Sequence, residues 1–207
     1  MKYFNQSFKE KLQEVIEEIE SQSLVEVVVV AKPRSSKYAD VPLGWGIGAV
    51  FATFTFLMFS HIEFPHDLFY AITLASFVVG MLIPLAIKPA MRLFIGKTRM
   101  RKAVEIMGRA FFQKAGIRHT QDEIGVLFYV SVFEKQEFVL PDRGAANEVP
   151  QEEWEAMQDR LSTVFSADDP ASQLLKELRD CAPIFSAFIP PIENDINELP
   201  DYVDVSL

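Results

Sequence analysis

The chain has 207 residues, of which 49% are apolar, a share at the high end for a soluble protein, and its formal net charge is −9. Residues 119–207 carry 19 acidic and 5 basic side chains, which argues against nucleic acid as a partner, whereas residues 88–102 carry six basic and no acidic side chains, which suits a membrane surface. The single cysteine, Cys181, excludes an intramolecular disulfide and a cysteine-based metal cluster, and its apolar neighbours favour inert core packing.

The first forty residues predict an amphipathic helix followed by a buried strand. Apolar residues from Phe8 to Ile19 recur at helical spacing among Glu and Lys side chains. The next segment, residues 24–31, reads LVEVVVVA, and an unbroken run of valines is typical of a strand that is covered on both faces. Pro33 is expected to end this strand.

Two uncharged runs follow, residues 41–60 and 68–87, each 20 residues long. At a helical rise of about 1.5 Å per residue, each would span roughly the 30 Å hydrocarbon thickness of a bilayer. A domain of this size has little room for two buried helices that are apolar on all sides. We therefore expect a transmembrane hairpin over residues 41–87 rather than a pair of core helices. No cleavage pattern of a signal peptide follows the first run, so we expect the protein to stay attached.

The connection between the two runs carries four potential metal ligands, of which His61, Glu63 and His66 are the candidates for a metal site. A tip this short would be solvated and would lack supporting groups around the ligands, so a metal site is the less favoured interpretation. We expect Pro65 to help turn the chain and Asp67 to cap the second helix.

The distribution of Lys and Arg around the runs predicts the orientation of the protein. Basic residues precede the first run (Lys32, Arg34, Lys37) and follow the second, whereas the connection has none. By the positive-inside bias, both termini and the soluble domain are expected on the cytoplasmic side of a bacterial inner membrane. The basic residues after the second run are expected to lie on anionic lipid headgroups, and they are Lys88, Arg92, Lys97, Arg99, Arg101 and Lys102.

Small residues recur at intervals of four in the first run, at Gly44, Gly48 and Ala52, so all three lie on one helix face and permit close backbone approach. The second run offers Ala71 and Ala75 at the same interval. We expect the face to pack within the hairpin, and the alternative is a face for another protein.

The sequence after the hairpin alternates helix and strand signals. Residues 99–116 predict a second amphipathic helix, with Gly116 as its C-terminal cap. Two apolar segments, 124–133 and 137–140, are separated by three polar residues and predict a β-hairpin, and residues 141–144, PDRG, form a typical turn sequence.

Two more helices are predicted before the C-terminus. The first opens at Pro150, and the second opens at Asp169-Pro170 and is expected to break near Pro183. The acidic tail, residues 190–207, is expected to lie against the domain in its first half and to be mobile at its end.

Neither soluble portion has enough strands for a covered sheet by itself. Residues 1–40 and 88–207 together give helix, strand, helix, strand, strand, helix, helix. We therefore predict one α/β domain, with a central mixed sheet flanked by helices, that is interrupted by the hairpin at residues 41–87. The two strands on either side of the hairpin should be parallel neighbours joined by a right-handed crossover.

Five segments occur in a recognisable order: VEVVVVA with Tyr38 beyond it, RKAVEIMGRAFF, HTQDEIGVLFYVSVFEKQEFVLPDRG, VPQEEW and DINELPD. Together they resemble the TPM domain, also called the TPM phosphatase-like domain, over roughly residues 10–202 apart from the hairpin. The most specific residues of the resemblance are Thr120 with residues 125–127, Asp142 with Gly144, Trp154, and residues 195–201.

The resemblance implies a mixed α/β sandwich with a central sheet. Relatives in thylakoids are linked to photosystem II maintenance and to a weak acid phosphatase activity, and an animal relative modulates a receptor channel. Many relatives carry a cleaved signal and a membrane segment at the C-terminal end of the domain. This chain departs from that pattern, because its two apolar runs lie inside the domain.

Carboxylates are the candidates for chemistry in the soluble part. If Asp142, Asp122 and Glu26 converged at one edge of the sheet, their oxygens could hold Ca²⁺ or Mg²⁺ for hydrolysis of a phosphate ester. The favoured alternative is that Glu26 pairs with a basic side chain such as Arg101 or Arg109, and that Asp142 caps a turn. The sequence contains no GxSxG, HExxH or nucleotide-binding loop.

These patterns predict a non-enzymatic integral membrane protein, serving as an accessory, assembly or stabilising subunit of a larger membrane complex. Its expected partners are membrane lipids and other integral membrane proteins, and no cofactor is expected. The alternative hypothesis is a weak acid phosphatase that depends on a divalent metal ion.

Overall fold

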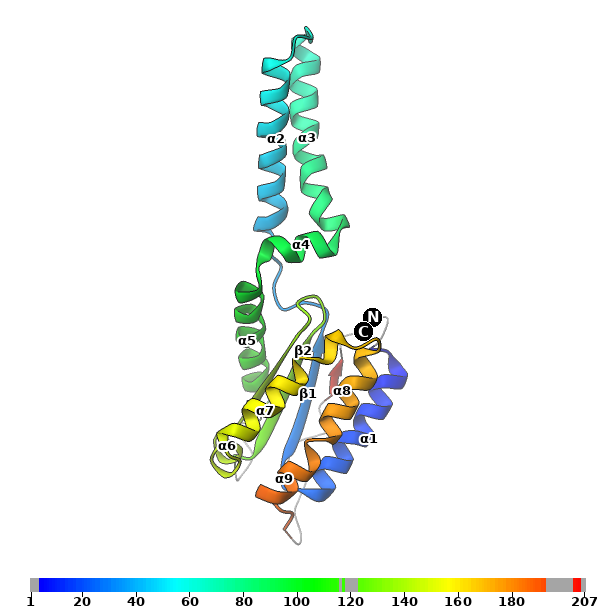
Figure 1. The fold of residues 1–207 in the computed structure, drawn as a ribbon, viewed down its shortest axis with the longest axis vertical. Coiled ribbons are helices and arrows are strands. Elements are labelled where there is room, and N and C mark those ends of the chain that lie inside the picture. Colours follow the sequence, from blue (N-terminus) through cyan, green and yellow to red (C-terminus); the bar gives the residue numbers. More distant parts are fainter. Residues whose placement is uncertain (1–3, 116, 118–122, 193–202, 206–207) are drawn as a thin grey trace. The chain divides into compact units, whose positions relative to one another are not determined.

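The structure is a computed structural model, and it describes residues 4–115, 117, 123–192 and 203–205. The chain divides into two compact units. We call residues 1–35 and 101–207 the sheet unit, and residues 36–100 the hairpin unit. The hairpin unit is therefore an insertion between two parts of one folded domain, as the order of predicted elements indicated (Figure 1).

Among its described residues, the sheet unit contains four strands, which are β1 (Glu26–Lys32), β2 (Gly125–Ser131), β3 (Gln136–Pro141) and β4 (Val203–Val205). Its helices are α1 (Gln6–Gln22), α6 (Arg143–Glu148), α7 (Gln151–Leu161), η2 (Val164–Ser166), α8 (Pro170–Arg179), α9 (Ala182–Phe188) and most of α5 (Lys97–Lys114), which begins in the hairpin unit. The hairpin unit contains α2 (Asp40–Phe59), α3 (His66–Ala86) and α4 (Lys88–Ile95).

The strands form one mixed sheet in the order β3-β2-β1-β4. β1 pairs with β2 in parallel, with Glu26 opposite Gly125, so the parallel pair predicted on either side of the insertion is confirmed. β2 and β3 form the predicted antiparallel hairpin. β4 was not predicted: the end of the tail, expected to be mobile, instead pairs in parallel with β1, with Val29 opposite Val203.

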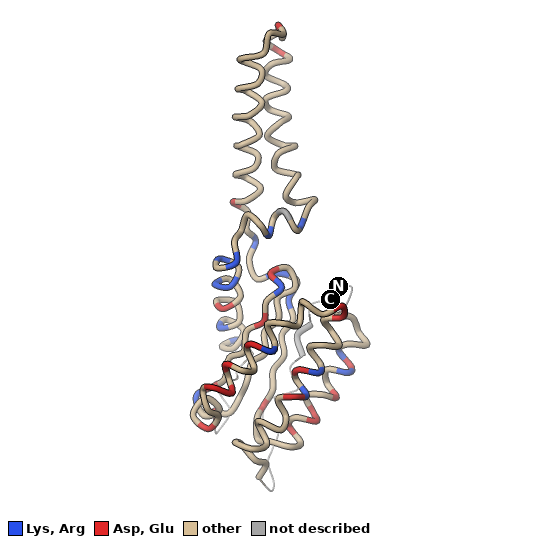
Figure 2. Tube along the Cα trace, in the orientation of Figure 1, with Lys and Arg blue, Asp and Glu red and all other residues tan. Residues whose placement is uncertain are grey.

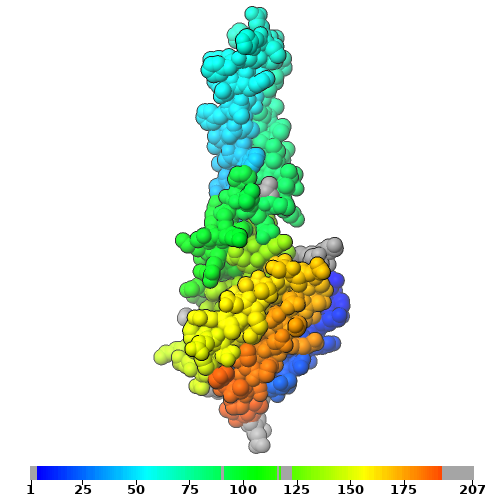
Figure 3. Space-filling model, in the orientation of Figure 1, coloured from blue at the N-terminus to red at the C-terminus, as the bar shows by residue number. Residues whose placement is uncertain are grey.

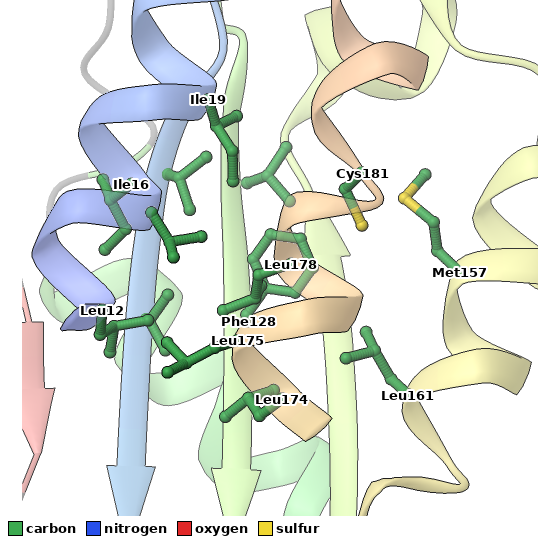
Figure 4. Close-up of a cluster of buried hydrophobic side chains, with 14 of the residues drawn as sticks. Leu12, Ile16, Ile19, Phe128, Met157, Leu161, Leu174, Leu175, Leu178 and Cys181 are labelled. Atoms are coloured by element: carbon green, nitrogen blue, oxygen red, sulfur yellow. The ribbon is translucent and has the colours of Figure 1, made fainter. Parts of the chain in front are cut away.

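Helices cover both faces of the sheet, which confirms an α/β fold with a mixed sheet flanked by helices. Alternate residues of β1 point to opposite faces: Val27 and Val29 join a large core with α1, α7, α8 and α9, whereas Val28 and Val30 join a smaller core with α5. Figure 4 shows the large core, and Figure 3 shows α7, α8 and α1 side by side over it. The valine run forms a strand because both of its faces are buried.

Most predicted helix boundaries in the sheet unit are confirmed. Pro150 stands at the N-cap of α7, and Asp169 caps α8 by accepting the backbone N–H of Ala171 at 3.1 Å. Pro183 lies in the first turn of α9, so the break predicted there separates two helices. The predicted cap at Gly116 lies outside the described residues.

The short helix α4 of the hairpin unit was not predicted. The sequence gives it only one clear signal, Pro89 in its first turn, and it is two turns long. Its N-terminal neighbour α3 ends at Ala86, and Gly96, with a φ of 76°, separates it from α5. That positive φ favours glycine, because a side chain there would be strained.

Candidate functional site

The two hairpin helices, α2 and α3, are long and apolar enough to cross a membrane. Only 22% of the most apolar window of α2 and 11% of that of α3 is buried, whereas a core helix of a soluble protein would be mostly buried. Large side chains such as Phe51 and Phe59 are 68% and 79% exposed. Figure 2 shows that charged residues lie at the ends of this pair and not along it. The hairpin therefore presents an apolar surface that its own fold does not cover.

The two helices contact each other through glycines that the sequence interpretation did not select. A Cβ atom added at Gly80 would lie 2.5 Å from the Cβ of Ala49 and 2.8 Å from the carbonyl oxygen of Trp45. A Cβ atom at Gly46 would lie 3.0 Å from the ring of Phe77. Gly46 and Gly80 therefore lie where α2 and α3 approach most closely.

The small residues that the sequence singled out lie on a different face. A Cβ atom added at Gly44 or Gly48 would have no heavy atom within 4 Å, and Ala71 and Ala75 are not buried. The expectation that Gly44, Gly48 and Ala52 pack within the hairpin is thus wrong. α2 has glycines on two faces. The rotation of α2 about its own axis against α3 decides which of these faces lies in the contact between the two helices.

The unused face forms one wall of an apolar groove of about 600 Å³ within the hairpin unit. We call it the small-residue groove. Its one charged member is Asp40, at the start of α2. The lining residues are Asp40, Val41, Gly44, Trp45, Gly48, Ala49, Ala52, Gly80, Ile83 and Phe94.

The basic residues predicted to meet lipid headgroups have different surroundings. Arg99 donates two hydrogen bonds to Asp40, each 2.6 Å long, and its guanidinium lies 5.3 Å from the ring centre of Tyr38. Arg101 pairs with Glu105 at 3.1 Å. Four others, Lys88, Arg92, Lys97 and Lys102, have no ion pair among the described residues. Three of these, all but Arg92, are exposed.

The hairpin tip shows no arrangement that would hold a metal ion. His61, Glu63 and His66 are all exposed, and the described residues contain no group of three potential ligands close enough to share an ion. The predicted cap of α3 is corrected: Pro65 occupies the N-cap and no side chain bonds there, while Asp67 lies one residue inside the first turn. There its negative charge still interacts favourably with the positive, N-terminal end of the helix dipole.

Two of the three candidate catalytic carboxylates lie at one end of the sheet. Glu26 is paired with Gly125, whose carbonyl oxygen accepts the backbone N–H of Asp142 at 2.7 Å, so strand β2 lies between the two acids. Asp142 is buried and caps α6: its Oδ1 accepts the N–H of Arg143 at 2.8 Å, whereas its Oδ2 has no hydrogen bond among the described residues. The third candidate, Asp122, lies outside the described residues.

A buried polar chain, not foreseen from the sequence, holds the segment that leads out of β1. Ser35 donates to Ser131 at 2.8 Å, and Ser131 donates to the carboxylate of Glu134 at 2.5 Å. Because the Ser35 proton is used in this way, the hydroxyl of Tyr129, 3.0 Å away, is the donor to Ser35. Burial raises the pKa of Tyr129 to about 12, so the phenol stays protonated and keeps donating.

A hollow of about 310 Å³ lies along the outer edge of β3, with walls from α5 and α7. Gln158 of α7 covers this edge, because its side-chain amide accepts the N–H of Val139 at 3.1 Å and donates to the carbonyl of Glu137 at 3.0 Å. The Glu137 side chain is 8% exposed, and its Oε1 has no hydrogen bond among the described residues. Burial raises the pKa of this carboxyl to about 8.

Comparisons with known proteins bear on the fold and not on the chemistry. No model of a known protein family matches the sequence, and no curated protein matches it. Among solved structures, the chain is similar to the NMR structure of BA42 protein from the psychrophilic bacterium Bizionia argentinensis, with a TM-score of 0.59. The similarity covers 98% of this chain and 94% of that one at 14% sequence identity. At that identity the likeness concerns the fold alone.

Proposed function

We propose that this chain is a two-span protein of the bacterial cytoplasmic membrane, with a TPM-like sheet unit, that serves as an accessory, assembly or stabilising subunit of a larger membrane complex. The small-residue groove is the observation that carries the proposal. The hairpin packs through Gly46 and Gly80, which leaves Gly44 and Gly48 open beside a groove. A second helix could use them to approach closely.

The physical reason lies in how helices associate in lipid. Hydrocarbon chains solvate apolar side chains as well as another helix does, so association depends on close packing and on small residues that permit it. The open face of α2 supplies such residues. Trp45 and Phe94 also line the groove, and their rings pack edge to face with their centres 4.9 Å apart. The proposed occupant of the groove is therefore a membrane helix of the partner complex.

The charge distribution supports a cytoplasmic location for both termini and the sheet unit. The segments that join the hairpin to the sheet unit carry nine Lys and Arg between Lys32 and Lys102, whereas residues 61–67 carry none. The positive-inside bias then places residues 61–67 outside.

Co-purification in a mild detergent tests the proposal. Gly48→Val adds bulk to the open face and should lower the recovery of partner proteins roughly 5- to 150-fold, as expected for an interface loss of about 1–3 kcal/mol. Ala71→Val is the matched control, because Ala71 is an exposed small residue of α3 that does not line the groove. Unchanged recovery with Gly48→Val, or a wild-type chain that purifies alone at native expression, would contradict the proposal.

A weak phosphatase that depends on Ca²⁺ or Mg²⁺ is a second candidate. It is favoured by the buried, unbonded Oδ2 of Asp142 and by the position of Glu26 at the same end of the sheet. Asp142→Asn keeps the capping ability of this residue while removing its charge. The detergent-solubilised protein should hydrolyse a generic phosphate ester only with the divalent ion, and Asp142→Asn should abolish this; activity retained by the variant would exclude the assignment.

A further inference from the structure

Helix α4 of the hairpin unit has one buried side and one exposed apolar side. Met91 and Ile95, four residues apart, are 1% and 5% exposed. Leu93 is 79% exposed and, at about 100° per residue, lies on the opposite side of the helix, and Phe94 next to it is 56% exposed. Scattered exposed apolar residues are common, but adjacent large ones on a two-turn helix indicate a surface that binds another molecule or a membrane.

The charges of α4 indicate which partner this surface binds. Lys88 and Arg92 are also four residues apart, so they share a side of the helix that differs from the side of Leu93. No Asp or Glu occurs between Asp67 and Glu105, so the sequence on either side of α4 supplies no carboxylate to neutralise its basic residues. A surface that combines exposed apolar residues with uncompensated positive charge fits anionic phospholipids.

The position of α4 in the hairpin unit agrees with this partner. One residue, Ile87, separates α4 from the end of α3, and Figure 1 shows α4 turning across the end of the hairpin. Eight residues of helix are about 12 Å long, too short to cross a bilayer. Phe94 contacts Trp45 in the first half of α2, and Trp is the residue most typical of the membrane–water boundary.

We infer that α4 is an in-plane membrane helix, with Leu93 buried at the boundary of the acyl chains and Lys88 and Arg92 on the phosphates of anionic lipids. The inference rests on the proposed function, because it requires the hairpin to span a bilayer. It adds a specific ligand, the headgroup layer of the cytoplasmic leaflet, and a specific surface.

Site-directed spin labelling of the full chain in vesicles of phosphatidylcholine and phosphatidylglycerol tests the inference. Labels are attached to Leu93→Cys, Phe51→Cys in α2, and Glu152→Cys on the exposed surface of α7, in a Cys181→Ala background. Collisions with oxygen report the apolar region, and collisions with a nickel chelate report water. Leu93 and Phe51 labels should favour oxygen, whereas the Glu152 label should favour nickel.

The outcomes separate the inference from the proposed function. If the Phe51 label lies in the bilayer and the Leu93 label is as accessible to nickel as the Glu152 label, the interfacial helix is wrong while the spans stand. If the Phe51 label is itself in water, the membrane hairpin fails, and the inference fails with it.

Charge variants test the headgroup contact. Lys88→Glu with Arg92→Glu should shift the Leu93 label toward water in vesicles that contain phosphatidylglycerol, by roughly fivefold or more for each basic residue removed, and should have little effect in pure phosphatidylcholine. Lys176→Glu on α8 is the control, since Lys176 is an exposed lysine of the sheet unit. An equal shift in both lipids would overturn the contact with phosphates.

Discussion

At the residue scale, the clearest departure from ordinary chemistry is Glu137 on β3. Its side chain is buried, and the side-chain amide of Gln158 beside it bonds the backbone of β3, while the Oε1 of Glu137 has no hydrogen bond among the described residues. An ionised carboxylate in this place would lack solvation, which is why its pKa rises to about 8.

The raised pKa makes stability depend on pH in a defined direction. Between the ordinary value of 4.5 and about 8, the folded chain holds a proton on Glu137 that the unfolded chain has lost. Its contribution to stability is therefore fully present below about pH 4.5 and is lost as the pH rises to about 8.

We predict that Glu137→Gln raises the free energy of unfolding by roughly 2–4 kcal/mol near pH 8 and changes it little near pH 5. The neutral amide keeps the shape of the side chain without the cost of ionisation. Denaturant unfolding in detergent, followed by the fluorescence of Trp154 in a Trp45→Phe background, measures this difference in the free energy of unfolding. Glu155→Gln, an exposed carboxylate of α7, should show no such pH dependence, and a flat difference for Glu137→Gln would refute the explanation.

At the element scale, β1 organises the sheet unit. It is buried on both faces and bonded on both edges, by β2 along its whole length and by β4 opposite residues 29–31. The valine run predicted the buried faces, because β-branched apolar residues favour such strands. The pairing of the second edge could not be predicted, since residues 203–205, VDV, are too few and too polar to indicate a strand.

Removal of residues 203–207 should expose the backbone groups of β1 at Val29 and Ala31. We expect a loss of about 1–3 kcal/mol in the free energy of unfolding and a tendency to associate through the bared edge. Unfolding curves and light scattering of the truncated chain, compared with a chain that lacks only residues 206–207, measure both effects. Equal stability of the two chains would show that β4 contributes nothing.

At the scale of the whole molecule, an insertion of 65 residues interrupts a folded domain without dividing its core. Residues 36–100 form a separate unit, while β1 and β2, which flank them, remain adjacent strands. The exit from β1 is held by buried hydrogen bonds from Ser35 to Ser131 and from the N–H of Ser35 to Glu134 at 3.1 Å. All of these bonds join residues of the sheet unit, so the sheet unit can form them without the hairpin unit.

Replacement of residues 36–100 by a flexible Gly-Ser linker should therefore give a soluble domain that unfolds cooperatively, with a stability of about 5–15 kcal/mol. Size-exclusion chromatography and thermal unfolding by circular dichroism test this. A second variant, Ser35→Ala with Ser131→Ala in the same background, should lose about 1–3 kcal/mol, because Glu134 then keeps a buried oxygen without its hydroxyl donor. Aggregation of the linked domain with no cooperative transition would contradict the independence of the two units.

Patterns along the chain were enough to predict the α/β class, the parallel pair around an insertion, the β-hairpin and most helix boundaries. They reflect local rules: the period of apolar residues, the turn and cap residues, and the length of uncharged runs. Boundaries without such signals were missed, as at α4 and β4.

The sequence by itself determined that small residues would line α2 and that carboxylates would gather in the second half of the chain, because composition and spacing are local properties. Only the tertiary structure decided which glycines the hairpin uses and that Glu26 and Asp142 lie on either side of β2. It also decided that the Oε1 of Glu137 is buried without a hydrogen bond among the described residues. Those outcomes depend on how helices rotate and how strands register, and residues distant in sequence set both.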